Sequence, residues 1–315
     1  MIKFKTLLTS AALIAATQSV AQPQLTLRLD QATRDVSPML YGLMTEEINF
    51  SYEGGLYAQL IRNTSFTDDR NGQRKNPWTP WRSGGPKYWT LNDTVNARMH
   101  IDNNGGFNRA NSAALCLDAQ CGTEITNDGY WGFPISQNAH FEGALYAKTE
   151  MEKGGSLTVS LVSMDGKTVY ASQKISSIGS TWTKYSFSMD AVGTTPKTKD
   201  VKFRITVDET GKYWLTRITL FPQTFNNRKN GLRQDLMAMM KDMHPKFLRF
   251  PGGNYVEGND FRNRFDWKRT VGDPDERPGH MSPWGYRSTD GLGLLEFMQW
   301  AEDVGAEPLL AVFAG

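Results

Sequence analysis

The hydrophobic pattern of the chain is clearest in its last part. Phe247–Phe250 is a short apolar run that predicts a buried strand, and Pro251-Gly-Gly ends it at once. Apolar residues three and four positions apart predict amphipathic helices on either side, at 232–244 and 292–304. The apolar run 308–314 predicts a second buried strand. Strand, helix and strand in this order predict a βαβ unit, and continuously apolar strands favour a parallel sheet with both faces covered.

Weaker patterns near the N-terminus indicate where this sheet begins. Apolar and polar side chains alternate in residues 24–29, which predicts a short strand. The segment 39–49 predicts a second strand that ends in Glu46 and Glu47. The segment 54–62 predicts a short helix. Neighbouring side chains of a strand point to opposite faces, so one carboxylate can face a cleft while the other binds backbone or solvent. The alternative is a solvated strand end.

Between Thr67 and Pro222 the pattern changes to short alternating segments with turn residues between them. The strand candidates are 144–148, 156–163, 168–175, 184–189 and 200–207. Regularly spaced short strands without an amphipathic helix predict a β-sandwich, jelly-roll-like in class. If this sandwich is an insertion, the segments on its two sides join into strand, helix, strand, helix, strand. That order is the start of a (β/α)8 TIM barrel, incomplete in this chain.

The N-terminus has the pattern of a secretory signal peptide. A basic start, Met1–Lys5, precedes an apolar run, and Ser19-Val-Ala21 fits the cleavage rule, with cleavage expected after Ala21. A buried N-terminal helix is the alternative. The mature chain is therefore expected in the periplasm or outside the cell, with no membrane segment after signal removal. The predicted organisation is a signal peptide at 1–21, an N-terminal strand with the first βα segment at 22–66, the inserted sandwich at 67–222 and a truncated barrel segment at 223–315.

Charge and cysteine content narrow the possible functions. Lys and Arg number 35 against 33 acidic residues, without a basic stripe, so no nucleic-acid partner is expected. Cys116 and Cys121 predict a local disulfide in an exported chain, with two free thiols as the alternative. No histidine or further cysteine stands at ligand spacing, so neither a metal site nor another cofactor is predicted. The oligomeric state does not follow from the sequence.

The chain has no Gly-x-Ser-x-Gly, Walker or dinucleotide-binding motif. The candidate chemistry that remains is catalysis by carboxylates on a sugar substrate. The aromatic-rich sandwich is compatible with this, because aromatic faces can stack on sugar rings. Most of these aromatic residues are nevertheless expected in the core.

Several long motifs resemble the glycoside hydrolase family 51 α-L-arabinofuranosidases. They are 42–49, 54–63, 248–256, 277–280, 284–297 and 301–308. The resemblance implies the N-terminal portion of an exported member, with a carbohydrate-binding-module-like sandwich inserted in the barrel. It also implies retaining hydrolysis of terminal non-reducing α-L-arabinofuranosides in L-arabinose metabolism. The expected partner is an arabinose-containing plant polysaccharide or oligosaccharide, such as arabinan or arabinoxylan.

Retention requires two carboxyl groups about 5 Å apart. The resemblance places both beyond Gly315, so it implies no catalytic residue here and an inactive fragment. It implies four substrate-binding residues: Glu46 and Asn254 contact arabinose, Arg249 lies beneath the catalytic carboxylates, and Trp284 forms a pocket wall. The structural alternatives are a turn Asn, an Arg in a buried ion pair and a core Trp. The alternative function is a non-catalytic carbohydrate-binding protein.

Overall fold

The computed structural model describes residues 24–31, 34–68, 86–108 and 112–314. The predicted signal peptide, 1–21, lies outside the described residues. The chain divides between Leu40 and Tyr41 into two units, and the sheets described below all belong to the second. The strand predicted at 24–29 is wrong, because the segment forms no regular structure and an alternating pattern makes a strand only where a partner strand is present. Among the described helices, none combines the length and apolar character that crossing a membrane requires.

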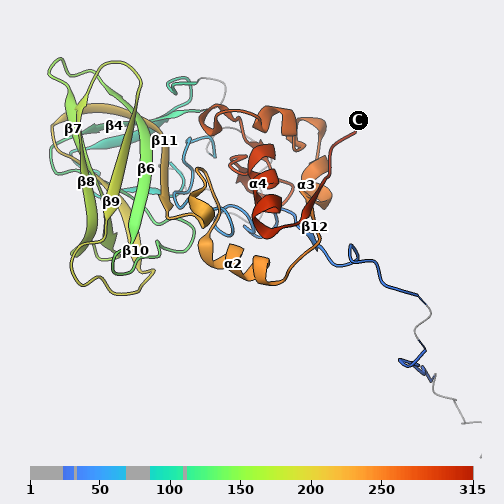
Figure 1. The fold of residues 1–315 in the computed structure, drawn as a ribbon. Coiled ribbons are helices and arrows are strands. Elements are labelled where there is room, and N and C mark those ends of the chain that lie inside the picture. The colour runs from blue at the N-terminus through green and yellow to red at the C-terminus, as the bar shows by residue number, and fades with distance from the viewer. Residues whose placement is uncertain (1–23, 32–33, 69–85, 109–111, 315) are drawn as a thin grey trace, which may run out of the picture. The chain divides into compact units, whose positions relative to one another are not determined.

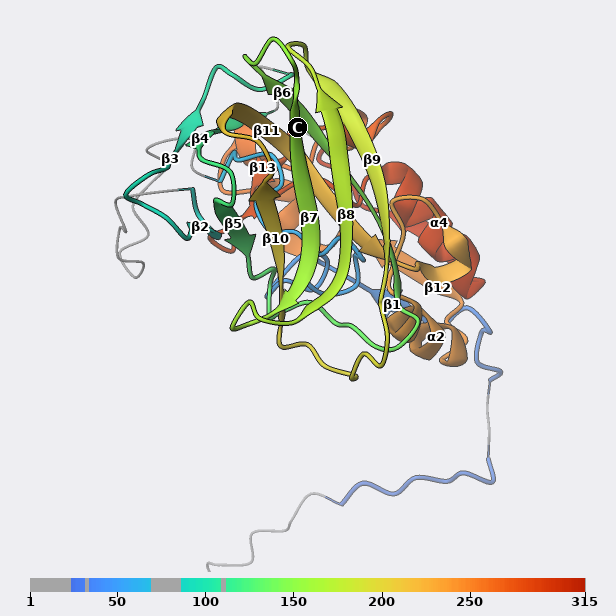
Figure 2. The ribbon, with the colours of Figure 1, turned by 90° about the vertical axis from the view of Figure 1, so that its left-hand side faces the viewer.

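Two five-stranded antiparallel sheets form the middle of the chain (Figures 1 and 2). The first sheet has the order β2 (Trp89–Leu91), β5 (Glu124–Asn127), β10 (Val201–Val207), β7 (Gly155–Ser163) and β8 (Val169–Ile178). The second has the order β3 (Arg98–Asp102), β4 (Ala114–Ala119), β11 (Gly211–Pro222), β6 (His140–Thr149) and β9 (Thr183–Asp190). One apolar core draws residues from both, such as Phe203 from the first and Leu215 from the second.

The five strands predicted in this region are all present, as β6 to β10. Strand β10 shows why, since burial alternates along its whole length and leaves every second residue partly exposed. Strand β11 was missed because six consecutive residues, Tyr213–Ile218, are buried, and because its register shifts between Thr216 and Thr219. A strand covered on both faces lacks the alternation that reveals a half-exposed strand.

The predicted disulfide between Cys116 and Cys121 is wrong, because both thiols are free. Cys116 lies inside β4, buried against Trp214. The remaining three residues of the strand carry the chain about 10 Å further, whereas a disulfide needs Cα atoms within about 7 Å. Cys121 stands exposed in the following turn, where its N–H donates to Thr210 Oγ1.

A second, smaller sheet is parallel throughout. Its order is β1 (Leu43–Met44), β12 (Phe247–Phe250) and β15 (Glu307–Leu310). Helices α2 (Gln234–Asp242) and α4 (Leu294–Val304) contribute to its core, and Figure 1 shows both beside β12. The predicted strand, helix, strand order is therefore confirmed, although β15 is shorter than predicted and largely exposed instead of buried.

Two further local predictions need correction. The segment 54–62 forms turns and isolated bridges instead of a helix, because it runs along β11, where Leu60 N–H donates to the Leu220 carbonyl. Helix α2 packs with Met237 inward, whereas Met239 is 67% exposed, so its methionines do not all pack in the core.

Strand β12 and helix α4 are joined by a long segment of short elements. They are α3 (Gly253–Glu257), the 3₁₀ turns η2 (Phe261–Asn263), η3 (Trp267–Thr270) and η4 (Pro274–Glu276), and the hairpin β13 (His280–Met281) and β14 (Arg287–Ser288). A further 3₁₀ turn, η1 (Phe225–Asn227), precedes α2. The segment between β12 and α4 and the loop after β1 carry the candidate site.

Candidate functional site

Three of the four predicted substrate-binding residues meet at one edge of the parallel sheet. Glu46 follows the end of β1, Arg249 is the last residue but one of strand β12, and Asn254 lies in α3, which follows β12. Because β1 and β12 are parallel, their carboxyl ends point to the same side, where ligands of such sheets bind. Backbone bonds join the two strand ends, from Thr45 N–H to the Arg249 carbonyl at 3.0 Å and from Gly252 N–H to the Thr45 carbonyl at 2.7 Å.

The Glu46 carboxylate is fixed against the Pro-Gly-Gly turn. Its Oε1 accepts a hydrogen bond from Tyr255 N–H at 2.8 Å. A Cβ added to Gly253 would stand 2.3 Å from Glu46 Oε2, and Gly253 has φ +56°, so only glycine fits beside this carboxylate. The second glycine of the turn therefore makes room for the acid.

An open cleft of about 630 Å³ lies at this edge. Arg249 and Gly253 line it, together with 256–261 and 311–314. Within the described part of the chain, the side chains of Arg249 and Asn254 make no hydrogen bond or ion pair. The structure thus gives Asn254 no turn-stabilising side-chain bond and Arg249 no buried acidic partner, and both polar groups are available to a ligand.

The neighbouring acid, Glu47, points the opposite way and is fully buried. It accepts hydrogen bonds of 2.6 Å from Tyr52 N–H and from the Tyr286 hydroxyl. Burial raises the pKa of Glu47 to about 7, against the opposing effect of these bonds. The expected division of the two carboxylates between opposite faces is confirmed, although the role of Glu47 as an anchor was not foreseen.

Trp284, the fourth predicted residue, stands in the β13–β14 turn with 38% of its surface exposed, so it is not a core tryptophan. The hairpin is attached to the loop after β1 through Tyr286, whose ring stacks on Phe50 at 4.1 Å. Phe50 N–H also donates to the Tyr286 hydroxyl at 3.0 Å. The structure therefore joins the hairpin of Trp284 to the loop of Glu46, and among the described residues no hydrogen bond, ion pair or ring contact joins Trp284 to the other three.

Comparison with known proteins identifies the relatives of this chain. The profile of the "Alpha-L-arabinofuranosidase 1 domain" family matches residues 239–315. Alpha-L-arabinofuranosidase 1 of Arabidopsis thaliana is 35% identical over 307 residues, covering 93% of this chain and 43% of the relative. The structure of an arabinose-bound MgGH51 α-L-arabinofuranosidase superimposes with a TM-score of 0.77 at 34% identity, covering 88% of this chain and 44% of that one.

This chain is similar to the family 51 α-L-arabinofuranosidases. Alpha-L-arabinofuranosidase A of Aspergillus niger agrees, at 35% identity over 90% of this chain and 44% of the relative. The chain thus spans less than half the length of the relatives it matches.

In the described residues, no group of three His, Cys, Asp or Glu side chains could hold a metal ion.

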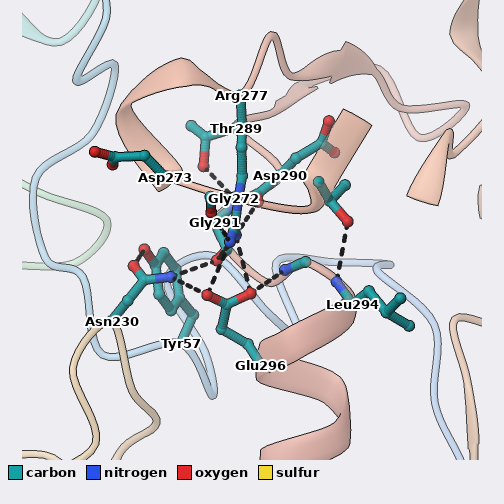
Figure 3. Close-up of polar contacts among 12 residues, drawn as sticks. Tyr57, Asn230, Gly272, Asp273, Arg277, Thr289, Asp290, Gly291, Leu294 and Glu296 are labelled. Atoms are coloured by element: carbon teal, nitrogen blue, oxygen red, sulfur yellow. Dashed lines mark hydrogen bonds and ion pairs between the residues drawn. The ribbon is translucent and has the colours of Figure 1, made fainter. Parts of the chain in front are cut away.

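The family motif that begins at Arg277 has a structural role that the sequence did not reveal (Figure 3). The Arg277 guanidinium is buried and donates to both Glu296 oxygens at 2.9 Å. It also donates to the carbonyls of Asp290 and Gly291, at 3.0 and 2.9 Å. Glu296 in turn accepts from Gly293 N–H at 2.8 Å. This pair fastens the segment before α4 to the first turn of that helix.

A second buried acid, Glu53, was also missed. Its Oε1 accepts hydrogen bonds of 2.6 Å from both the N–H and the hydroxyl of Thr289. Tyr130, from the segment between β5 and β6, donates to its Oε2 at 3.4 Å. Burial raises the pKa of Glu53 to about 8. The only sequence signal was that Glu53 stands next to one quoted motif and Thr289 within another.

Proposed function

We propose that this chain forms the first half of the arabinose pocket of a retaining α-L-arabinofuranosidase. The observation that carries the proposal is the meeting of Glu46, Arg249 and Asn254 at one sheet edge, beside an open cleft. The relatives that match the chain bear the name of this activity, and the matched structure has arabinose bound.

Each side chain has a distinct task in this proposal. The Glu46 carboxylate uses one oxygen on Tyr255 N–H and offers its remaining acceptor positions to arabinose hydroxyls. Asn254 offers an amide that can both donate and accept. The unpaired Arg249 guanidinium would keep an adjacent carboxylate ionised and hence nucleophilic.

The two catalytic carboxyl groups belong, in this proposal, to the part of the relatives that this chain does not match. The three parallel strands would then open a (β/α)8 barrel, with the antiparallel sheets as a carbohydrate-binding-module-like insertion. The substrate is a terminal non-reducing arabinofuranose on arabinan or arabinoxylan, released for L-arabinose metabolism. The signal peptide at 1–21 would direct the enzyme to the periplasm or the medium, and N-terminal sequencing of the exported protein is expected to begin at Gln22.

The test is the steady-state hydrolysis of 4-nitrophenyl α-L-arabinofuranoside by the enzyme encoded in the complete reading frame. Glu46→Ala is expected to lower kcat/KM at least about tenfold, because it removes charged hydrogen bonds worth about 1.5–3 kcal/mol. Glu46→Gln retains an acceptor for Tyr255 N–H and shows whether charge or local folding is lost. Glu152→Ala, an exposed acid in the β6–β7 turn, is the control. Unchanged turnover in Glu46→Ala would remove Glu46 from the site.

A further inference from the structure

Two tryptophans of the described chain present much of their surface to solvent. Trp131 is 59% exposed and Trp284 is 38% exposed, whereas Trp89, Trp214 and Trp300 are buried. A large aromatic ring exposed to this degree loses the free energy that burial would provide, so folding does not explain its position. The two tryptophans lie in loops that are far apart in the sequence. Trp131 lies between β5 and β6, and Trp284 lies between β13 and β14.

An aromatic bridge connects these two sites. The Trp131 ring meets Phe50 edge-on, with centroids 5.8 Å apart at 87°. The Phe50 ring also stacks on Tyr286, which stands two residues from Trp284. Phe50 therefore stands between the exposed indole of the antiparallel sheets and the hairpin that carries the predicted pocket wall. Phe50 also lies in the loop after β1, four residues after Glu46.

Phe50 is held rigidly in this place. Phe50 has a φ angle of 61°, which bulky L-residues rarely adopt. The strain is offset by the hydrogen bond from Phe50 N–H to Tyr286, by the stack, and by the Arg62 guanidinium 4.9 Å from the Phe50 centroid. A residue with a strained backbone and this many contacts forms a fixed support for Trp131.

We propose that Trp131 forms a sugar-binding subsite outside the arabinose pocket, where its indole stacks on a xylopyranose unit of the xylan backbone. This inference rests on the proposed function. A β-linked xylopyranose carries its hydroxyls equatorially and presents a flat C–H face, which matches an exposed indole. Phe50 and Tyr286 connect the subsite to the loop that carries Glu46 and to the hairpin that carries Trp284. A backbone that bears the arabinose branch would pass over Trp131 while the branch enters the cleft.

The experiment compares polymer and single-sugar substrates with the enzyme from the complete reading frame. For Trp131→Ala, the ratio of kcat/KM on arabinoxylan to kcat/KM on 4-nitrophenyl α-L-arabinofuranoside is expected to fall about threefold to tenfold, mainly through KM. Trp131→Phe keeps an aromatic face and should restore most of this ratio. Tyr41→Ala is the matched control, since Tyr41 is an exposed aromatic residue before β1, at the amino end of the parallel sheet.

The other outcomes each decide against the inference. An unchanged ratio, or one that falls with a lowered Tm and is not restored in Trp131→Phe, means that Trp131 packs against protein instead of substrate. An equal loss on linear arabinan overturns the assignment to a xylan backbone. If the wild-type enzyme hydrolyses neither substrate, the proposed function fails; if it hydrolyses both while Trp131→Ala keeps the ratio, only the subsite fails.

Discussion

Glu46 and Glu47 are neighbours in the chain, yet their carboxylates occupy different environments. Glu46 keeps one oxygen near the open edge, where Gly253 leaves it room. Glu47 is closed off and uses both oxygens to fix Tyr52 and Tyr286. The alternation of side chains in an extended segment is enough to separate them. One acid is therefore free to meet a ligand because the other anchors the loop that carries both.

The buried Glu53 carboxyl makes stability depend on pH. Its pKa is raised from 4.5 to about 8, so the folded state keeps a proton that the unfolded chain releases above pH 4.5. Stability from this group is complete below pH 4.5 and is lost as the pH rises to 8. We measure the free energy of unfolding in urea at pH 5 and at pH 8. Its decrease between these two pH values is expected to be at least about 1 kcal/mol larger in the wild type than in Glu53→Gln. Parallel curves for the two proteins would show that Glu53 does not titrate in this range.

At the scale of elements, the hairpin β13–β14 depends on one hydroxyl. Tyr286 donates to Glu47 and accepts from Phe50 N–H, so Tyr286→Phe removes one partner of the buried Glu47 carboxyl and the partner of the part-buried Phe50 N–H while the ring stack remains. We expect chemical denaturation to give an unfolding free energy about 1–3 kcal/mol lower. Tyr170→Phe in β8 is the control and should stay within about 0.5 kcal/mol of the wild type. Equal stability of both variants would contradict an anchoring role for Tyr286.

The Arg277–Glu296 pair is the corresponding anchor of α4. Arg277→Met leaves the Glu296 carboxylate buried without its charged partner, and we expect thermal and urea unfolding to show a loss of about 3–5 kcal/mol. Arg233→Ala breaks a largely solvent-exposed pair with Asp235 and should cost less than about 1 kcal/mol. A loss as small as that of the control would mean that the segment before α4 is held by other contacts.

The elements with clear periodicity were predictable, and the anchors between them were not. The alternating strand β10 and the helical spacing of α4 appear directly in the sequence, because each is half exposed. The extended segment 54–62 was mistaken for a helix because its conformation comes from β11, far along the chain. The bond between Tyr286 and Glu47 joins residues 239 positions apart, and no local pattern records it. Glu46, Arg249 and Asn254 were found through family motifs, and their meeting follows from parallel strand ends.

At the scale of the whole molecule, the antiparallel sheets and the parallel segment are connected within one compact unit, residues 41–315. Lys184 of β9 forms an ion pair with Asp275 of η4, and Arg217 of β11 donates to the Arg277 carbonyl at 2.9 Å. Tyr130 adds a third link, through Glu53. Polar contacts from three different strands or loops resist relative movement of the antiparallel sheets and the parallel segment.

The parallel sheet leads to the last prediction. Strand β15 pairs with β12 on one side only within the described chain, and Leu309 on it is 49% exposed. An apolar strand with an unpaired edge promotes association. We expect the chain 22–315 to self-associate in size-exclusion chromatography and to bind a hydrophobic dye. Leu309→Lys should reduce association by placing a charge on the edge, with Lys167→Ala, at an exposed turn, as the control. A monodisperse chain 22–315 without dye binding would show that the three-stranded sheet is already sufficiently covered.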